Sequence, residues 1–171
     1  MKQKKPYILQ VCGLKNTGKT KFIGELVQYL HEKQYQVAVI KHDGHEFDTK
    51  HYTEDNFQHY NKGADASVVF SNGQWICVKR EKTTLEHWIE RFQYMDFIII
   101  EGCKQANYPK VEMLRKGINE TPVSNPEGRV ACIIDWNCDT KKMTYNRNDK
   151  ELCEKIINNI DIFYKKQDDI L

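Results

Sequence analysis

No apolar run in this 171-residue sequence approaches the roughly 20 residues that a membrane-spanning helix requires. An excess of charge of one sign is also absent, because 26 lysines and arginines nearly balance 24 aspartates and glutamates, giving a net charge of +2. Such a small charge favours neither a nucleic-acid backbone nor an anionic membrane as a partner. The N-terminal stretch MKQKKPYILQVCG is basic and then apolar, but its apolar part is too short for a signal peptide. We expect a cytoplasmic protein that binds neither nucleic acid nor a membrane.

The sequence also lacks any C-x-x-C pair, the spacing typical of redox and zinc sites. Its six cysteines are scattered, and several stand in apolar runs such as VACIID, where a reduced cysteine acts as a small hydrophobic residue. A disulfide framework is therefore not expected. We find no internal repeat, low-complexity tract or linker, and the length suits one domain, so we expect residues 1–171 to form a single domain.

Apolar and amphipathic segments alternate along the chain. Strands are predicted at residues 7–13, 36–42, 96–102, 110–116 and 129–135, and helices at 21–34, 83–92 and 149–166. The opening order of strand, helix and strand is a βαβ unit, which implies a parallel sheet. The dipeptide Asn72-Gly73 separates two alternating apolar runs and predicts a β-hairpin within residues 66–80. Residues 56–65 read as a short helix ended by Gly63.

A glycine-rich loop stands between the first predicted strand and the first predicted helix. Its sequence GLKNTGKT matches the phosphate-binding pattern G-x-x-x-x-G-K-[ST], in the strand–loop–helix context that the pattern requires. Glycines let several backbone N–H groups point into one concavity, and the helix N-terminus adds partial positive charge there. We therefore predict a P-loop NTPase-type α/β fold, a three-layer sandwich with a mostly parallel sheet and one hairpin extension. The predicted phosphate-binding residues are Gly13, Leu14, Lys15, Asn16, Thr17, Gly18, Lys19, Thr20 and Lys21.

A phosphate-binding loop of this kind works with a metal ion, usually Mg²⁺, and a carboxylate at the end of a neighbouring strand. In MDFIIIEG, Glu101 ends the apolar strand and Asp96 opens it, so the two carboxylates should lie at opposite ends of the sheet. We therefore predict that Thr20 and Glu101 hold Mg²⁺, and that Asp96 has a capping or surface role.

Two further segments contain polar residues of the kinds found in binding sites. The loop KHDGHEFD carries His42, His45 and Asp48, whose side chains could contact phosphate or substrate, hold a transition metal, or form a plain loop. The segment NKGAD at residues 61–65 approximates a guanine-reading NKxD element. It has one residue too many and precedes the carboxylate strand, so it is interpreted as a helix end followed by a strand start.

Taken together, these segments resemble the MobB family of GTP-binding adapter proteins in molybdopterin-guanine dinucleotide biosynthesis. The resemblance covers nearly the whole chain and is carried by GLKNTGKT, KHDGH with Asp48, EDNFQHYNKGAD, DFIIIEGCKQANYPKVEMLR and VSNPEGRVACIID. Within these segments Lys104, Lys110 and Arg115 match the family pattern. The chain departs from it at Asn56, Gln58 and Asn125, where the family usually has serine, arginine and aspartate.

The resemblance implies a homodimer that binds GTP with Mg²⁺ and assists a guanylyltransferase that joins GMP to molybdopterin. His42, His45, Asp48 and Lys104 join the expected nucleotide-binding residues, and direct contact with molybdopterin is left open. Lys19 and Lys15 are the candidates for stabilising charge during hydrolysis, since no arginine stands in the P-loop or in KHDGHEFD. We expect at most a slow GTPase.

Two alternatives stay open. A small-metabolite P-loop kinase would usually carry an arginine-bearing lid, and the arginines after Glu101 are far apart in the sequence. A GTP-dependent metallochaperone would favour a histidine-rich tract, for which only the loop with His42 and His45 offers a hint.

Overall fold

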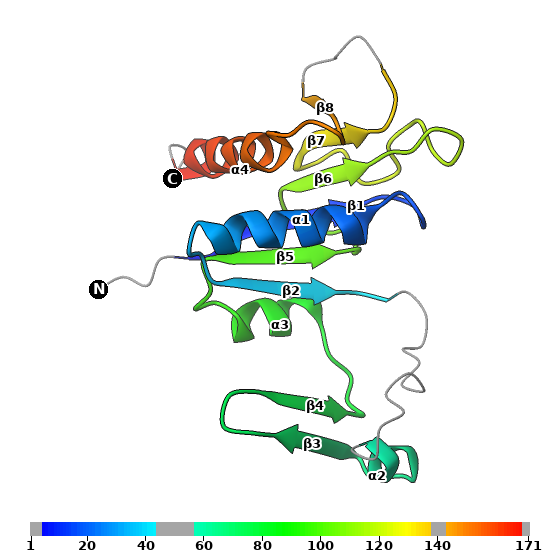
Figure 1. Ribbon diagram of the computed structural model, residues 1–171, viewed down its shortest axis with the longest axis vertical. Helices are drawn as coiled ribbons and strands as arrows, with labels where there is room; N and C mark the ends of the chain where they lie inside the picture. Colours follow the sequence, from blue (N-terminus) through cyan, green and yellow to red (C-terminus); the bar gives the residue numbers. More distant parts are fainter. Residues whose placement is uncertain (1–4, 44–56, 138–142, 169–171) are drawn as a thin grey trace. The chain divides into compact units, whose positions relative to one another are not determined.

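The computed structural model describes residues 5–43, 57–137 and 143–168. The chain divides into two compact units, one formed by Met1–His42 with Ile89–Leu171 and the other by Asp43–Trp88. The first unit contains a six-stranded sheet, and the second contains a two-stranded sheet (Figure 1). That residues 1–171 form a single domain stays a prediction.

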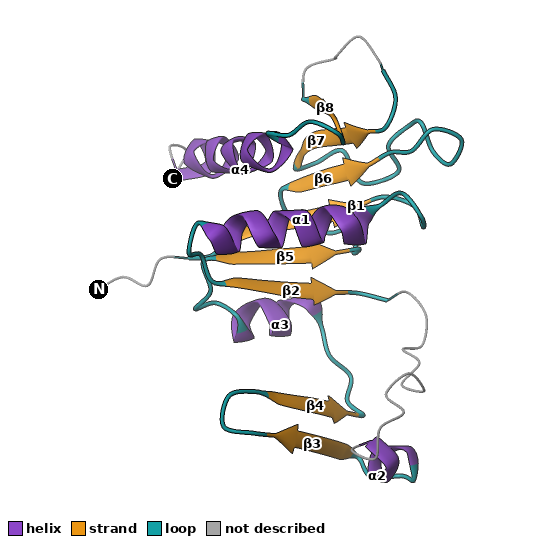
Figure 2. Cartoon of the chain, viewed as in Figure 1, coloured by secondary structure: helices purple, strands orange, loops and turns teal. Residues whose placement is uncertain are grey.

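The large sheet is parallel at every strand pair (Figure 2). Its strands follow the order β2-β5-β1-β6-β7-β8. They are β1 Tyr7–Cys12, β2 Val37–Lys41, β5 Phe97–Glu101, β6 Lys110–Met113, β7 Arg129–Ile134 and β8 Thr144–Asn146. Because β1 lies in the middle with β5 and β6 as neighbours, the loop after β1 emerges where the strand order reverses, the place where open parallel sheets bind ligands. The predicted α/β fold with a mostly parallel sheet is confirmed.

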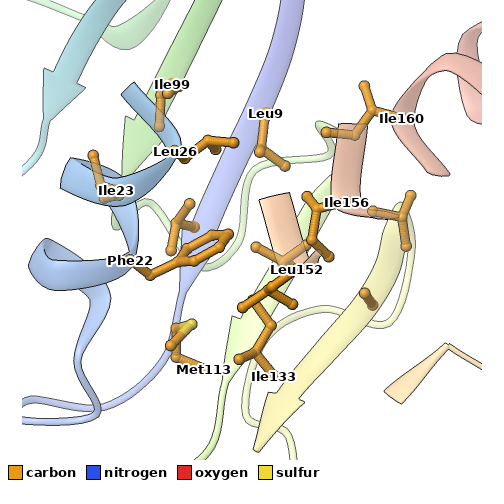
Figure 3. Packing of buried hydrophobic residues seen from close by; sticks show 14 of the residues in the cluster. Leu9, Phe22, Ile23, Leu26, Ile99, Met113, Ile133, Leu152, Ile156 and Ile160 are labelled. Atoms are coloured by element: carbon orange, nitrogen blue, oxygen red, sulfur yellow. The ribbon is translucent and has the colours of Figure 1, made fainter. Parts of the chain in front are cut away.

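Two amphipathic helices, α1 Lys19–Glu32 and α4 Leu152–Asp168, pack on the sheet through their apolar sides. Leu26 of α1 and Ile156 of α4 are fully buried in one cluster with Leu9, Ile99 and Ile133 of the sheet (Figure 3). Full burial of such a side chain stabilises the fold by about 1.5–3 kcal/mol relative to an exposed position. This cluster fixes the start of α1 against the end of β1, and thereby fixes the loop between them.

The second unit contains the short helix α2 Gln58–Asn61 and the predicted hairpin of β3 Ala66–Phe70 and β4 Trp75–Lys79. The turn is closed by the Ser71 N–H, which donates to the Gln74 carbonyl at 2.8 Å. Segment 61–65 joins α2 to β3, as interpreted from the sequence. Helix α3 Leu85–Arg91 follows the hairpin and spans the boundary between the units.

Strand β8 was not predicted from the sequence. Its three residues, Thr144-Tyr145-Asn146, are half-buried and form no apolar run. They form a strand because they pair in parallel with β7 at the edge of the sheet. No two of the five cysteines in the described ranges are joined by a disulfide. None of the helices in the described ranges has the length and apolar character to span a membrane.

Candidate phosphate-binding site

The glycine-rich loop runs from the end of β1 to the start of α1, and its backbone adopts conformations that favour glycine. Gly13 and Gly18 have φ angles of 137° and 94°, and Asn16 lies in the left-handed region at 64°. A Cβ on Gly13 would lie 2.6 Å from the Met113 carbonyl oxygen, so β6 leaves room for glycine alone. The loop therefore curls tightly beside β6, as a phosphate-binding loop must.

Lys19, the first residue of α1, turns its side chain back over the loop. Its Nζ donates hydrogen bonds to the carbonyls of Leu14 at 2.8 Å and Gly13 at 3.3 Å. Burial lowers the pKa of Lys19, and the nearby negative charge of Glu101 opposes that shift. The ammonium group is thus held at the centre of the loop, where it can reach a bound phosphate.

Glu101 brings a buried carboxylate to the same edge of the sheet. In the parallel register, Glu101 lies between Lys41 of β2 and Val11 of β1. Its Oε1 accepts a hydrogen bond from the Thr20 hydroxyl at 3.3 Å and forms an ion pair with Lys41 Nζ at 3.7 Å. Two adjacent oxygen ligands from Glu101 and Thr20 are the hard donors that Mg²⁺ prefers, so this pair fits the predicted metal.

These groups surround one open depression of about 890 Å³. It is lined by Lys15, Asn16, Gly18, Lys19, Thr20, Lys21, Lys41, Glu101, Arg115, Lys116 and Ile118. Most of the charged side chains are lysines and arginines, and Glu101 is the single carboxylate among the lining residues that the structure describes. This surplus of positive charge makes the depression suitable for an anionic ligand.

Of the other predicted site residues, the structure describes His42 and Lys104 but not His45 and Asp48. His42 is exposed directly after β2, whereas His45 and Asp48 lie outside the described residues. Lys104 is half-buried in the loop after β5, and its positive charge contributes to the lowered pKa of Lys19. Across the described part of the chain, no group of three His, Cys, Asp or Glu side chains could hold a metal.

Two arginines contact the loop from outside, and sequence reasoning assigned neither of them to it. Arg115, after β6, donates from Nη1 to the Asn16 carbonyl at 2.8 Å and lies 3.7 Å from Asp135. Arg147, after β8, donates from Nη2 to the Thr17 carbonyl at 2.5 Å. No local signal could have found these contacts, because they join residues about 100 or more positions apart in the sequence.

The opposite end of the sheet carries a second depression, of about 470 Å³. Tyr7, Tyr35 and Tyr94 line it, together with Asp96. The Asp96 carboxylate accepts the Gln36 N–H at 2.8 Å, which agrees with the capping role predicted for this residue. None of the residues predicted to bind phosphate or metal lines this second depression. The candidate site is therefore the depression beside the P-loop, at the other end of the sheet.

The parallel sheet, the loop between β1 and α1, and the carboxylate at the end of β5 define an α/β protein of the P-loop class. Comparison with known families takes this class further. A family model described as molybdopterin guanine dinucleotide synthesis protein B, or MobB, matches residues 8–136. The chain therefore belongs to the MobB family.

Individual relatives agree with this assignment. The chain is 35% identical over 111 residues to the probable molybdopterin-guanine dinucleotide biosynthesis adapter protein of Bacillus subtilis, a match that covers 63% of this chain and 64% of that protein. It is 30% identical over 114 residues to a putative adapter protein of the same description from Methanocaldococcus jannaschii, covering 63% of this chain and 47% of that protein. The matched region thus spans less than two thirds of each relative.

Solved structures show the same fold. The crystal structure of Bacillus subtilis MobB superposes with a TM-score of 0.74 at 27% identity, covering 89% of this chain and 96% of that chain. A MobB homologue from Bacillus stearothermophilus gives a TM-score of 0.70 over 91% of this chain and 99% of that chain. Its identity is 20%, so this second likeness supports the fold alone.

Proposed function

We propose that the chain binds GTP with Mg²⁺ in the depression formed by the loop after β1. The observation that carries this proposal is the convergence of Lys19, Thr20 and Glu101 in one basic depression of a MobB-family protein. Lys19 would contact the outer phosphates, and Thr20 and Glu101 would hold Mg²⁺ directly or through water. Bound Mg²⁺ would offset charge on the phosphates, while the loop N–H groups orient them.

The biological role that fits this site is that of an adapter in molybdopterin-guanine dinucleotide synthesis. The relatives from Bacillus subtilis and Methanocaldococcus jannaschii are named as adapter proteins of this biosynthesis. The chain would present bound GTP, or a conformation set by it, to the guanylyltransferase that attaches GMP to molybdopterin. A cytoplasmic location is part of this proposal, because the partner and substrate would act there.

A homodimer is part of the proposal, and the hairpin supports it. Phe70 and Trp75 form a cross-strand pair in β3 and β4, yet their exposed fractions are 80% and 61%. Val68, two residues before Phe70 and therefore on the same face of the hairpin, is also more than half exposed. Adjacent apolar side chains of this size usually become covered in an assembly, and a second copy of the chain offers the same surface in return.

The choice of nucleotide tests the proposed function most directly. We expect calorimetric titration with Mg²⁺ present to show tighter binding of GTP than of ATP. Adding the guanylyltransferase of the pathway should form a complex whose affinity depends on GTP, because linked binding is reciprocal. Equal affinity for the two nucleotides would remove the support for a guanine-specific adapter and revive the kinase alternative.

A further inference from the structure

Arg147 lies in the turn after β8, beyond the residues 8–136 that match the family. Its guanidinium group rests directly on the P-loop. A Cβ built on Gly18 would lie 3.1 Å from Nη1, 3.2 Å from Nη2 and 3.4 Å from Cζ, so the two terminal nitrogens of the group lie against Gly18. Nη2 also donates to the Thr17 carbonyl at 2.5 Å. A side chain larger than glycine at position 18 would displace this arginine.

The backbone around Arg147 is itself fixed. Its N–H donates to the Ile134 carbonyl at 2.8 Å, which extends the pairing of β8 with β7. The Asn146 side chain accepts the Asn148 N–H at 2.9 Å, and the Asn146 carbonyl accepts the Asp149 N–H at 3.1 Å. The turn therefore aims Arg147 at the loop without depending on a bound ligand.

Because the peptide bond is planar, fixing the Thr17 carbonyl also fixes the direction of the Gly18 N–H. In a trans peptide the C=O of one residue and the N–H of the next point to opposite sides, and no cis peptide occurs among the described residues. With the Thr17 oxygen turned toward Arg147, the Gly18 N–H points away from Arg147. Gly18 lines the depression, whereas Arg147 is not among its lining residues in the described part of the chain. Arg115 also binds a loop carbonyl, that of Asn16, but it does so from the lining of the depression itself.

Arg147 also differs from an ordinary surface arginine in its burial. Its Nε is buried and has no hydrogen-bond partner within the ranges that the structure describes. A buried donor without a partner raises the free energy of the folded state, so its presence calls for an explanation. Here the guanidinium is held by its contact with the loop.

We propose that Arg147 is a positioning residue of the P-loop, which orients the Gly18 N–H toward a bound polyphosphate by fixing the Thr17 carbonyl outside the loop. The inference rests on the proposed function only in requiring that the loop binds phosphate. It does not depend on guanine, on molybdopterin or on a partner protein.

The test uses the full chain and two probes, Mg²⁺–GTP and Mg²⁺–tripolyphosphate, titrated by calorimetry. Arg147→Met keeps an apolar stem but removes every donor, and we expect its Kd to rise about tenfold or more for both probes alike, the effect of losing one charged hydrogen bond. Arg147→Lys retains a donor and should recover part of that affinity. Arg80→Ala is the matched control, because Arg80 holds the Tyr60 and Ala64 carbonyls in the second unit and its loss should leave both Kd values unchanged.

Several results would overturn the inference. Unchanged binding by Arg147→Met would do so, and weakened GTP binding with unchanged tripolyphosphate binding would assign Arg147 to the nucleoside instead. A wild-type chain that bound neither probe would remove the phosphate cradle altogether. Failure of the GTP adapter function alone would instead leave tripolyphosphate binding in place, dependent on Arg147.

A measurement on the wild-type chain keeps the inference testable even if Arg147→Met does not fold. The Gly18 amide proton should move downfield in the nuclear magnetic resonance spectrum when tripolyphosphate is added, since its N–H would then donate to a phosphate oxygen. A Gly18 amide that does not respond to the ligand would contradict the proposed orientation.

Discussion

Lys19 is held over the loop by two backbone carbonyls, and a bound phosphate would replace these with a full negative charge. Charge-assisted hydrogen bonds contribute about 1.5–3 kcal/mol. We therefore expect Lys19→Ala to weaken Mg²⁺–GTP binding by roughly 10- to 150-fold in calorimetric titration. Lys33→Ala, just past the far end of α1, is the control. An unchanged Kd for Lys19→Ala would remove the assignment of the loop.

Protonation of Lys19 should also make GTP binding depend on pH. Only the protonated amine attracts phosphate, and burial lowers the pKa of Lys19 below its usual 10.5. The affinity for GTP should accordingly fall as the pH rises through this lowered value. Lys19→Ala should lack that alkaline decline, which distinguishes the titration of Lys19 from a general loss of positive charge.

Asp96 directly precedes β5 and Glu101 ends it, so the two carboxylates permit a matched comparison. Glu101→Gln keeps the shape of the side chain but loses the charge that attracts Mg²⁺. We expect the Mg²⁺ concentration needed for half-maximal GTP binding to rise by at least about tenfold. Asp96→Asn, at the opposite end of the sheet, should leave it unchanged. The reverse pattern would mean that the metal carboxylate had been placed at the wrong end.

At the scale of single elements, the turn from β1 into α1 depends on a glycine that other residues cannot replace. Gly13→Ala would combine a positive φ with a Cβ 2.6 Å from the Met113 oxygen. We expect it to lower the free energy of unfolding by at least about 1–3 kcal/mol in urea titrations. Gly24→Ala provides the contrast, since nothing lies within 4 Å of its added Cβ and α1 should gain about 0.5–1 kcal/mol. Equal effects would show that the backbone of Gly13 is not strained by a side chain.

The elements differ in how well their sequences predict them. Strand β5 was predictable because an unbroken run of apolar residues indicates a strand covered on both faces, and the structure buries every residue of it. The end of that run also placed Glu101 at the edge of the sheet where the P-loop lies. Strand β8 was not, because Thr144-Tyr145-Asn146 becomes a strand only through pairing with β7. The contacts of Arg115 and Arg147 with the loop follow from the order of strands in the sheet, which local patterns do not determine.

At the scale of the whole molecule, the exposed hairpin predicts how copies of the chain associate. We expect the double variant Phe70→Ser with Trp75→Ser to shift the mass measured by light scattering from that of two chains toward that of one. Tyr94→Ser removes a comparably exposed aromatic, at 58%, from the other unit and should leave the mass of the assembly unchanged. A double variant with an undiminished mass would place the dimer interface elsewhere.

The rate of hydrolysis is also a property of the whole assembly. Rapid GTP hydrolysis needs a cation on the developing charge, often supplied by another protein. Arg115 and Arg147 already bind loop carbonyls, so the candidates are Lys19 and the exposed Lys15, both of which line the depression. We expect the isolated protein to turn over GTP far more slowly than about 1 s⁻¹ in steady-state assays. Turnover of tens per second without a partner would make the chain an enzyme in its own right.

The pairing of β8 with β7 has a consequence for the protein as it is synthesised. The P-loop at residues 13–20 leaves the ribosome early, whereas Arg147 contacts Thr17 across 130 positions of sequence. Contacts of such long separation form late, because the intervening chain must first be ordered. While β8 and Arg147 are still inside the ribosome, the nascent chain carries the whole P-loop sequence without the guanidinium group that contacts Thr17 and Gly18. On the proposed role of Arg147, we expect the loop to bind phosphate tightly only after most of the sheet has been translated.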